Sequence, residues 1–358
     1  MEDHKERELF PDLLRGFAVI LVVFGHCIQE GSGEAYRAGQ QYFSDRLYQF
    51  IYSFHMPLFM MISGYLSWNS IIHAGDKDGR LSLVRRRAAS LLVPVFAWTA
   101  LDYMRILIVN AQSGKPQPEA LVFVYFYNAL NNLWFLWAVW WCFLAVFVMR
   151  HFLKERAVIY VLGFLVMFVI PDGLGLGAYK YMLPYYLFGY YMHDSMQLRG
   201  WNFSNKPKLW MTVVAGLAFI GLFRYYNEDS LIYLTGYKLI GTQAVRQLWI
   251  DIYRFLIGLV GSLFFVFLWQ YISVWFGKAD RSAAVRMVLR FFQLLGVYSM
   301  GIYIVSGYLL ILFVHRLEFI DHPSYVLNVF EAAAVLLVSL SATVLFGKVP
   351  VLKRLVGK

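Results

Sequence analysis

Long apolar segments recur from one end of this 358-residue chain to the other, and they limit its fold more than any other feature. Hydrophobic residues make up 60% of the sequence and charged residues only 15%, whereas soluble proteins contain about 25% charged residues. An α-helix needs about 20 apolar residues to cross a bilayer. The pattern therefore predicts an all-α, polytopic integral membrane protein with about ten transmembrane helices. The expected spans are 13–30, 47–68, 88–109, 131–149, 157–171, 178–194, 209–226, 248–275, 289–314 and 325–346.

The connections between these spans are short. The longest hold about twenty residues or fewer, which is too few for a separate soluble domain. The sequence shows no internal repeat, so residues 1–358 are predicted to form a single membrane domain. The segment 1–8 is too charged for a cleaved signal peptide, and the first span is therefore expected to remain as an anchor.

Lysine and arginine are distributed unevenly between alternate connections. When the N-terminus is placed in the cytoplasm, most of the 32 basic residues fall at the cytoplasmic ends of the spans, among them Arg85, Arg86 and Arg87. Cytoplasmic connections of membrane proteins carry this excess, so we expect both termini in the cytoplasm. The net charge of +10 is then a topology signal in a protein surrounded by membrane lipids, and it does not call for a nucleic-acid partner.

The first span contains an arginine and a histidine, Arg15 and His26, eleven residues apart. Eleven helical steps turn through about 1100°, three turns plus roughly 20°, and rise about 16 Å. The two side chains therefore share one helix face, with a cation near the membrane surface and an imidazole deeper inside. Polar groups are costly in a membrane and favour a functional interpretation. The alternative is an interfacial arginine and a histidine hydrogen-bonded to a neighbouring helix.

Further segments follow this pair in a characteristic order. Together with Arg15 and His26 they resemble the acyltransferase-3 family of bacterial and animal integral-membrane acyltransferases. The resemblance covers nearly the whole chain, and it implies that residues 1–358 form a single membrane acyltransferase domain in the bacterial inner membrane, crossing it several times. The segments are Ser53–Tyr65, Arg85–Pro94, Leu133–Leu136, Leu183–Tyr190, Leu295–Tyr303 and Pro350–Lys358.

Two positions depart from the family pattern. The family often carries a second arginine three residues after the one that corresponds to Arg87, and this chain has Ser90 there. The penultimate helix of the family often carries a histidine, and Ser306 stands near that position. Both departures concern the donor and the acceptor rather than the fold.

The resemblance implies acyl transfer from acetyl-coenzyme A to a hydroxyl group of a cell-surface or lipid-linked glycan. The residues support the same chemistry, because a hydroxyl is a poor nucleophile until a base removes its proton. A histidine that titrates near neutral pH suits this role, and His26 is the candidate general base. A covalent acyl-histidine is the less favoured alternative.

The donor's phosphates require cations on the cytoplasmic side, and Arg15, Arg85, Arg86 and Arg87 are the candidates. Arginine binds phosphate through a planar fork as well as by charge. The rise of about 16 Å from Arg15 to His26 is similar to the length of an extended pantetheine arm. The alternative for the three consecutive arginines is a positive-inside signal without a binding role.

Two residues are candidates for acceptor binding. His55 precedes Pro57, a residue that allows a kink, and His55 could bind the acceptor, hold His26 in one tautomer, or bond to a neighbouring helix. Trp134 could stack on a sugar or serve as an interfacial anchor. We expect no metal site and no disulfide between the two cysteines, which both lie in apolar spans.

A transporter or exporter of a polysaccharide, or of its intermediate, is the alternative from another functional class. Transporters often contain internal repeats and broken helices around a site at the membrane midplane. Donor binding separates the two classes, because an exporter has no need of coenzyme A. The sequence leaves open the acceptor sugar, the length of the acyl group and the oligomeric state.

Overall fold

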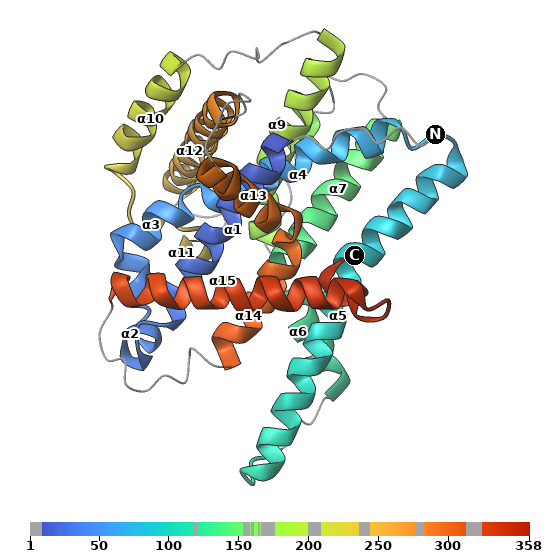
Figure 1. Cartoon of the computed structure of the whole chain (residues 1–358), viewed down its shortest axis with the longest axis vertical. Helices are drawn as coiled ribbons and strands as arrows, with labels where there is room; N and C mark the ends of the chain where they lie inside the picture. Colours follow the sequence, from blue (N-terminus) through green and yellow to red (C-terminus); the bar gives the residue numbers. More distant parts are fainter. Residues whose placement is uncertain are drawn as a thin grey trace.

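The computed structural model describes residues 9–116, 121–152, 158, 161–163, 165, 176–199, 209–235, 244–276, 283–312 and 324–358. Within these residues the chain forms helices and turns and no strand, which confirms the all-α prediction (Figure 1). The expected span 157–171 lies mostly outside the described residues. The longer helices are α1 (Leu9–Glu30), α4 (His55–Ile72), α5 (Lys77–Gln112), α6 (Leu121–Asn131), α7 (Trp134–Phe152), α9 (Leu176–Arg199), α10 (Leu209–Phe223), α12 (Ala244–Phe276), α13 (Ala283–Val297), α14 (Ser299–Leu312) and α15 (Tyr325–Lys348).

Five of the described helices are long and apolar enough to cross a membrane by themselves: α1, α5, α7, α12 and α15. The pair α13 and α14 qualifies as a sixth span only if the two are counted together. Helix α10 has 15 residues, about 22 Å of helix against a hydrocarbon core of about 30 Å. The structure thus supports a multi-pass membrane protein, while ten spans and cytoplasmic termini remain predictions.

Three expected elements differ in the structure. The span 47–68 is interrupted after α3 (Arg46–Tyr52). Pro57 lies in the first turn of α4, where N–H groups have no partner within the helix, so the proline removes no helical hydrogen bond. The span 289–314 is bent by 76° between α13 and α14. The expected connection 110–130 contains α6. Helix α5 begins at Lys77, well before the apolar segment, so the basic residues that precede this segment are also helical.

The main helix crossings depend on glycines that face each other. A Cβ atom on Gly64 of α4 would collide with the carbonyl oxygen of Tyr186, and one on Gly189 of α9 would collide with that of Met61. Gly16 of α1 and Gly296 of α13 form an equivalent reciprocal pair. Small residues of this kind let two helix backbones approach closely in a membrane. These crossings hold α1 and α4 in the centre of the bundle, where the candidate site residues lie.

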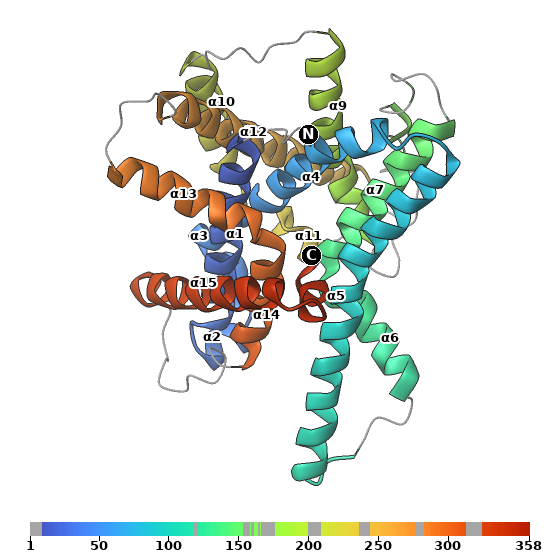
Figure 2. The same ribbon diagram turned by 45° about the vertical axis from the view of Figure 1, so that its right-hand side comes forward.

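The remaining helices surround this centre. Both views show the second half of α5, together with α6, projecting from the rest of the molecule, and the segment η4 (Leu352–Val356) lying beside α5 (Figures 1 and 2). Large apolar side chains are exposed on α5, α10 and α15, for example Ile108, Leu217 and Phe330, respectively. Exposed apolar surface of this kind suits contact with lipid.

Candidate functional site

One face of α1 carries the polar residues predicted from the sequence. Arg15 lines one cavity and His26 lines another, and both are half-buried. The Arg15 guanidinium pairs with the buried carboxylate of Asp12 at 3.9 Å. Val22 lies between Arg15 and His26 on the same face and touches both cavities. The shared face that the eleven-residue spacing predicts is therefore present.

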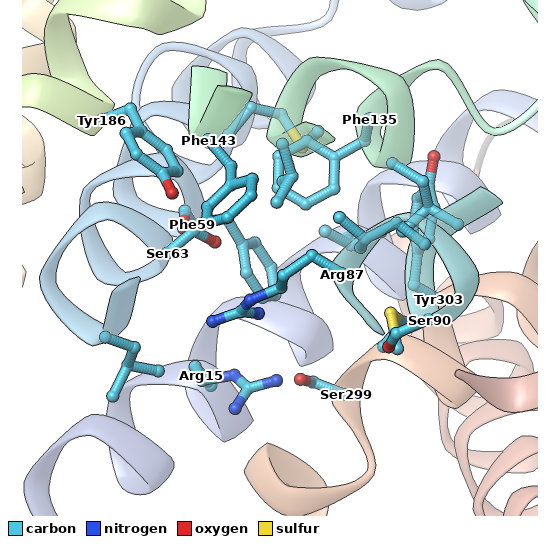
Figure 3. Close-up of a pocket in the computed structure, with 17 residues that line it drawn as sticks. Arg15, Phe59, Ser63, Arg87, Ser90, Phe135, Phe143, Tyr186, Ser299 and Tyr303 are labelled. Atoms are coloured by element: carbon cyan, nitrogen blue, oxygen red, sulfur yellow. The ribbon is translucent and has the colours of Figure 1, made fainter. Parts of the chain in front are cut away.

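The first of these, the arginine cavity, has a volume of about 310 Å³. Figure 3 shows the guanidinium groups of Arg15 and Arg87 turned into the same space, with the Ser299 hydroxyl beside Arg15. The Arg87 guanidinium also lies 5.7 Å from the centre of the Phe143 ring. The cavity is lined by Arg15, Val22, Met56, Phe59, Ser63, Leu66, Arg87, Ser90, Leu91, Phe135, Leu136, Val139, Phe143, Tyr186, Ser299, Met300 and Tyr303.

The three consecutive arginines separate in the structure. Arg87 is half-buried at the arginine cavity, whereas Arg85 and Arg86 are exposed and do not line it. All three lie on α5, and each helical step of about 100° turns Arg86 and Arg85 away from the direction of Arg87. The structure therefore brings Arg15 and Arg87 together and leaves Arg85 and Arg86 outside the cavity.

Ser90, where the family often has arginine, also lines the arginine cavity. Its hydroxyl donates a hydrogen bond of 2.8 Å to the carbonyl oxygen of Gly357, and a Cβ atom on Gly357 would meet Met300. The small Ser90 side chain thus lets the segment after α15 pack against two residues of the cavity wall, Ser90 and Met300. Ser306, the other departure, is buried away from both cavities and donates a hydrogen bond to the Tyr303 carbonyl oxygen at 3.2 Å.

The second cavity, which we call the histidine cavity, has a volume of about 300 Å³. It brings together His26, His55 and Trp134, three residues that the sequence analysis selected for catalysis and acceptor binding and that come from three different helices. Apart from its two histidines, its walls are aromatic side chains with Val22, Met56 and Gln29. The full lining is Val22, His26, Gln29, Tyr42, Phe43, Tyr48, Tyr52, His55, Met56, Trp134, Tyr233 and Tyr303.

His55 is buried at the start of α4, and its Nδ1 atom lies 2.7 Å from the carbonyl oxygen of Ile51. A carbonyl oxygen only accepts, so Nδ1 carries the proton and donates it, and Nε2 of the neutral ring is left as the acceptor. The edge of the ring packs against Tyr52, with 4.6 Å between ring centres. The imidazole is thereby held in one tautomer and one orientation at the cavity wall.

Trp134 begins α7 and packs edge-to-face with Tyr233, with ring centres 6.0 Å apart. The residue before it, Leu133, has a left-handed φ of 49°, which is unusual for a branched side chain and sets the direction in which α7 starts. Tyr42 comes from the connection after α1, and burial raises the pKa of its hydroxyl, so it stays protonated at neutral pH. The cavity therefore offers aromatic faces and neutral hydroxyl groups.

Three residues belong to the walls of both cavities: Val22 of α1, Met56 of α4 and Tyr303 of α14. They stand between the cation-lined space and the histidine-lined space. Their residue types are apolar or aromatic and do not by themselves mark a site. The helical spacing from Arg15 to Val22 to His26 was a usable signal for Val22, whereas only the packing of α4 and α14 against α1 brings in Met56 and Tyr303.

Two ion pairs lie within single helices: Arg105 pairs with Asp102 at 2.7 Å in α5, and Arg254 pairs with Asp251 in α12, where both are buried. Neither pair lines the two cavities, which favours a structural role. Among the described residues, no group of three or more His, Cys, Asp and Glu side chains is placed to hold a metal ion. Cys27 and Cys142 are both buried as free thiols.

The sequence that forms the two cavities matches a known protein family. Residues 8–348 match the acyltransferase domain that defines the acyltransferase-3 family. The chain belongs to the acyltransferase-3 family. The resemblance drawn from Arg15, His26 and the ordered segments is therefore confirmed, and the matched region contains every residue that lines the two cavities.

Two relatives are rhizobial nodulation proteins named NolL. The one from Sinorhizobium fredii is 28% identical over 193 residues, which cover 53% of this chain and 50% of the relative. The one from Mesorhizobium japonicum is 26% identical over 220 residues, which cover 60% of this chain and 56% of the relative. The chain thus matches about half the length of these relatives. No solved structure matches the chain significantly.

Proposed function

We propose that the chain is a membrane O-acyltransferase that uses acetyl-coenzyme A as donor and a hydroxyl group of a cell-surface or lipid-linked glycan as acceptor. The observation that carries the proposal is the placement of Arg15 and His26 in two cavities separated by the side chains of Val22, Met56 and Tyr303. The donor would bind on the arginine side and the acceptor on the histidine side. Membership of the acyltransferase-3 family supports the same reaction class.

The arginine cavity suits the phosphates of a coenzyme A thioester. Arg15 and Arg87 come from different helices and direct two guanidinium groups into one space (Figure 3). Arg15 pairs with the buried Asp12, and the second guanidinium group, that of Arg87, adds a further positive charge, which attracts a ligand with several negative charges. Guanidinium groups also pair with phosphate through two parallel N–H donors. Ser299 adds a hydroxyl donor at the same wall, whereas the Ser90 hydroxyl already donates to the Gly357 carbonyl oxygen.

The donor must extend out of the arginine cavity to react. A volume of about 310 Å³ is at the lower end of the range for small-molecule sites, roughly 300–1,000 Å³, and a coenzyme A thioester is larger than most ligands of such sites. The nucleotide would stay at the arginines, and the pantetheine arm would carry the thioester past Val22. A rise of about 16 Å along α1 separates Arg15 from His26, which an extended arm can cover.

The histidine cavity suits the acceptor. Tyr48, Tyr52 and Trp134 offer flat apolar faces against which a sugar ring can lie, and Gln29 offers an amide. His26 accepts the proton of the acceptor hydroxyl while the hydroxyl oxygen forms a bond to the acyl carbon. The carbon–sulfur bond breaks, and the protonated imidazole returns its proton to the leaving sulfur. The products are an O-acyl ester and free coenzyme A, with no change in oxidation state.

The test is turnover of labelled acetyl-coenzyme A by the purified protein and by His26→Ala. Removal of a general base lowers the rate by about 10²–10⁴-fold. The variant should therefore show no measurable acyl transfer, and any hydrolysis of the donor should be slow. The matched control is His73→Ala, because His73 is an exposed histidine just after α4 and lines neither cavity. Wild-type turnover by a folded His26→Ala protein would refute the role of His26.

An exporter is less well supported. A glycan would need a continuous wide path, and the two cavities of about 300 Å³ are separated by Val22, Met56 and Tyr303. Calorimetric titration with coenzyme A decides between the two functions. Binding that weakens in an Arg87→Ala variant supports the transferase, and a folded protein that neither binds nor turns over acetyl-coenzyme A contradicts it.

A further inference from the structure

Three side chains lie between the two cavities and belong to the walls of both. Val22 of α1 and Met56 of α4 are almost fully buried, at 3% and 6% exposed. Tyr303 of α14 completes the set and packs edge-on against Phe135, with ring centres 5.8 Å apart. The glycine crossings with α13 and α9 hold α1 and α4, and α14 packs closely against α15 at Gly301, where a Cβ atom would meet the Thr343 side chain. The three residues therefore belong to the rigid centre of the bundle.

Helix geometry places Val22 directly on the route from Arg15 to His26. Val22 lies seven residues after Arg15 and four residues before His26, which correspond to about 10 Å and about 6 Å along the axis. These spacings keep all three side chains within roughly 40° of one another around the helix. An elongated molecule that lies along this face with one end at Arg15 must pass Val22 before it reaches His26.

The acyl group must pass these side chains first. If the nucleotide is held by Arg15 and Arg87, the opposite end of the donor leads into the histidine cavity, and that end is the acyl group. Val22 is stiff at χ1 and cannot swing aside, and the glycine-held helices cannot separate readily. Met56 has three rotatable bonds and can yield to a slender chain. Such an opening admits a linear group, including the unbranched end of the pantetheine arm that follows the acyl group, and resists a branched one.

We propose that Val22, Met56 and Tyr303 form a gate that limits the donor to thioesters with unbranched acyl groups. The inference rests on the proposed acyltransferase function and names its donor class. It assigns a specificity role to three residues outside the predicted catalytic and phosphate-binding set. The acyl group meets the gate first, the unbranched end of the pantetheine arm follows it, and the nucleotide remains on the other side.

The experiment compares acetyl-, butyryl- and isobutyryl-coenzyme A as donors for the wild type, Val22→Ala and Met56→Ala. The controls are Val23→Ala and Met60→Ala, which remove the same side chains from fully buried neighbours that line neither cavity. Each methylene in an apolar site changes discrimination by about 10–200-fold. We expect the isobutyryl-to-butyryl ratio to rise by about tenfold or more in the gate variants and by less than about twofold in the controls.

A larger side chain that narrows the gate provides a second measurement. It does not depend on the cavities that the alanine substitutions leave in the core. In Val22→Phe the larger side chain should reduce acetyl transfer by about 100-fold while coenzyme A still binds, because the arginines are unchanged. Acetyl transfer at the wild-type rate in Val22→Phe, or an equal change of the ratio in gate and control variants, would overturn the gate alone. A folded wild-type protein that uses none of the three donors would overturn the proposed function and the gate with it.

Discussion

The sharpest prediction concerns Arg87, because the structure separates it from two neighbours that the sequence treats alike. Arg87 is half-buried and faces the arginine cavity with Arg15, whereas Arg85 is exposed on the same helix. If the cavity holds the donor phosphates, Arg87→Ala should weaken donor binding and Arg85→Ala should not. A role of the whole basic segment as a topology signal would give both variants the same small effect.

The magnitude follows from the environment of the guanidinium group. A hydrogen bond to a charged group contributes about 1.5–3 kcal/mol, and about 1.4 kcal/mol corresponds to a factor of ten in affinity. Solvent screens a half-buried cation, which favours the lower half of this range, so we expect Kd for coenzyme A to rise by about 10- to 40-fold in Arg87→Ala. An exposed charge contributes about 0–1 kcal/mol, which limits Arg85→Ala to less than about fivefold.

The assay is calorimetric titration of coenzyme A into the purified protein, combined with KM and kcat for acetyl-coenzyme A. Loss of a binding contact should raise KM and leave kcat nearly unchanged. Arg87→Lys keeps the charge but loses the planar fork, and it should recover only part of the affinity. Equal effects of Arg85→Ala and Arg87→Ala, or an unchanged Kd in a folded Arg87→Ala protein, would refute the assignment of the arginine cavity.

Two further predictions test the histidine cavity and the bundle. His55→Asn keeps a donor near the position of Nδ1 and its bond to Ile51, so it should retain more transferase activity and thermal stability than His55→Gln; the opposite order would contradict the inferred tautomer. Gly64→Ala should lower the melting temperature, since its Cβ atom would collide with the Tyr186 carbonyl and overpacking costs about 1–3 kcal/mol. Gly221→Ala, where a Cβ atom meets nothing within 4 Å, should leave that temperature unchanged or raise it, and equal shifts would show that helix propensity rather than packing governs both sites.

Several features of the fold were accessible from the sequence, because they depend on local pattern. Apolar runs predicted helices close to α1, α7, α12 and α15, and the spacing of Arg15 and His26 predicted their shared face. The bend between α13 and α14 was not predicted, and the only sequence signal near the interruption before His55 was Pro57, which allows a kink. Both lie within continuous apolar runs, and hydropathy does not distinguish a straight helix from two helices at an angle.

The candidate site also combines features that local sequence pattern indicated with features that only packing produced. The sequence alone determined that the chain is a helical membrane protein, that one face of its first span carries a cation and an imidazole, and that the ordered segments belong to an acyltransferase-3 protein. These conclusions follow from composition, from helical periodicity and from motifs along the chain.

Only the tertiary structure decided that Arg87 rather than Arg85 or Arg86 joins Arg15, and that Met56 and Tyr303 meet Val22 between the two cavities. The physical reason is that a cavity exists only where side chains from separate helices leave space between them. Its position depends on how the helices rotate and cross, and here the reciprocal glycine contacts of α1 with α13 and of α4 with α9 set that geometry.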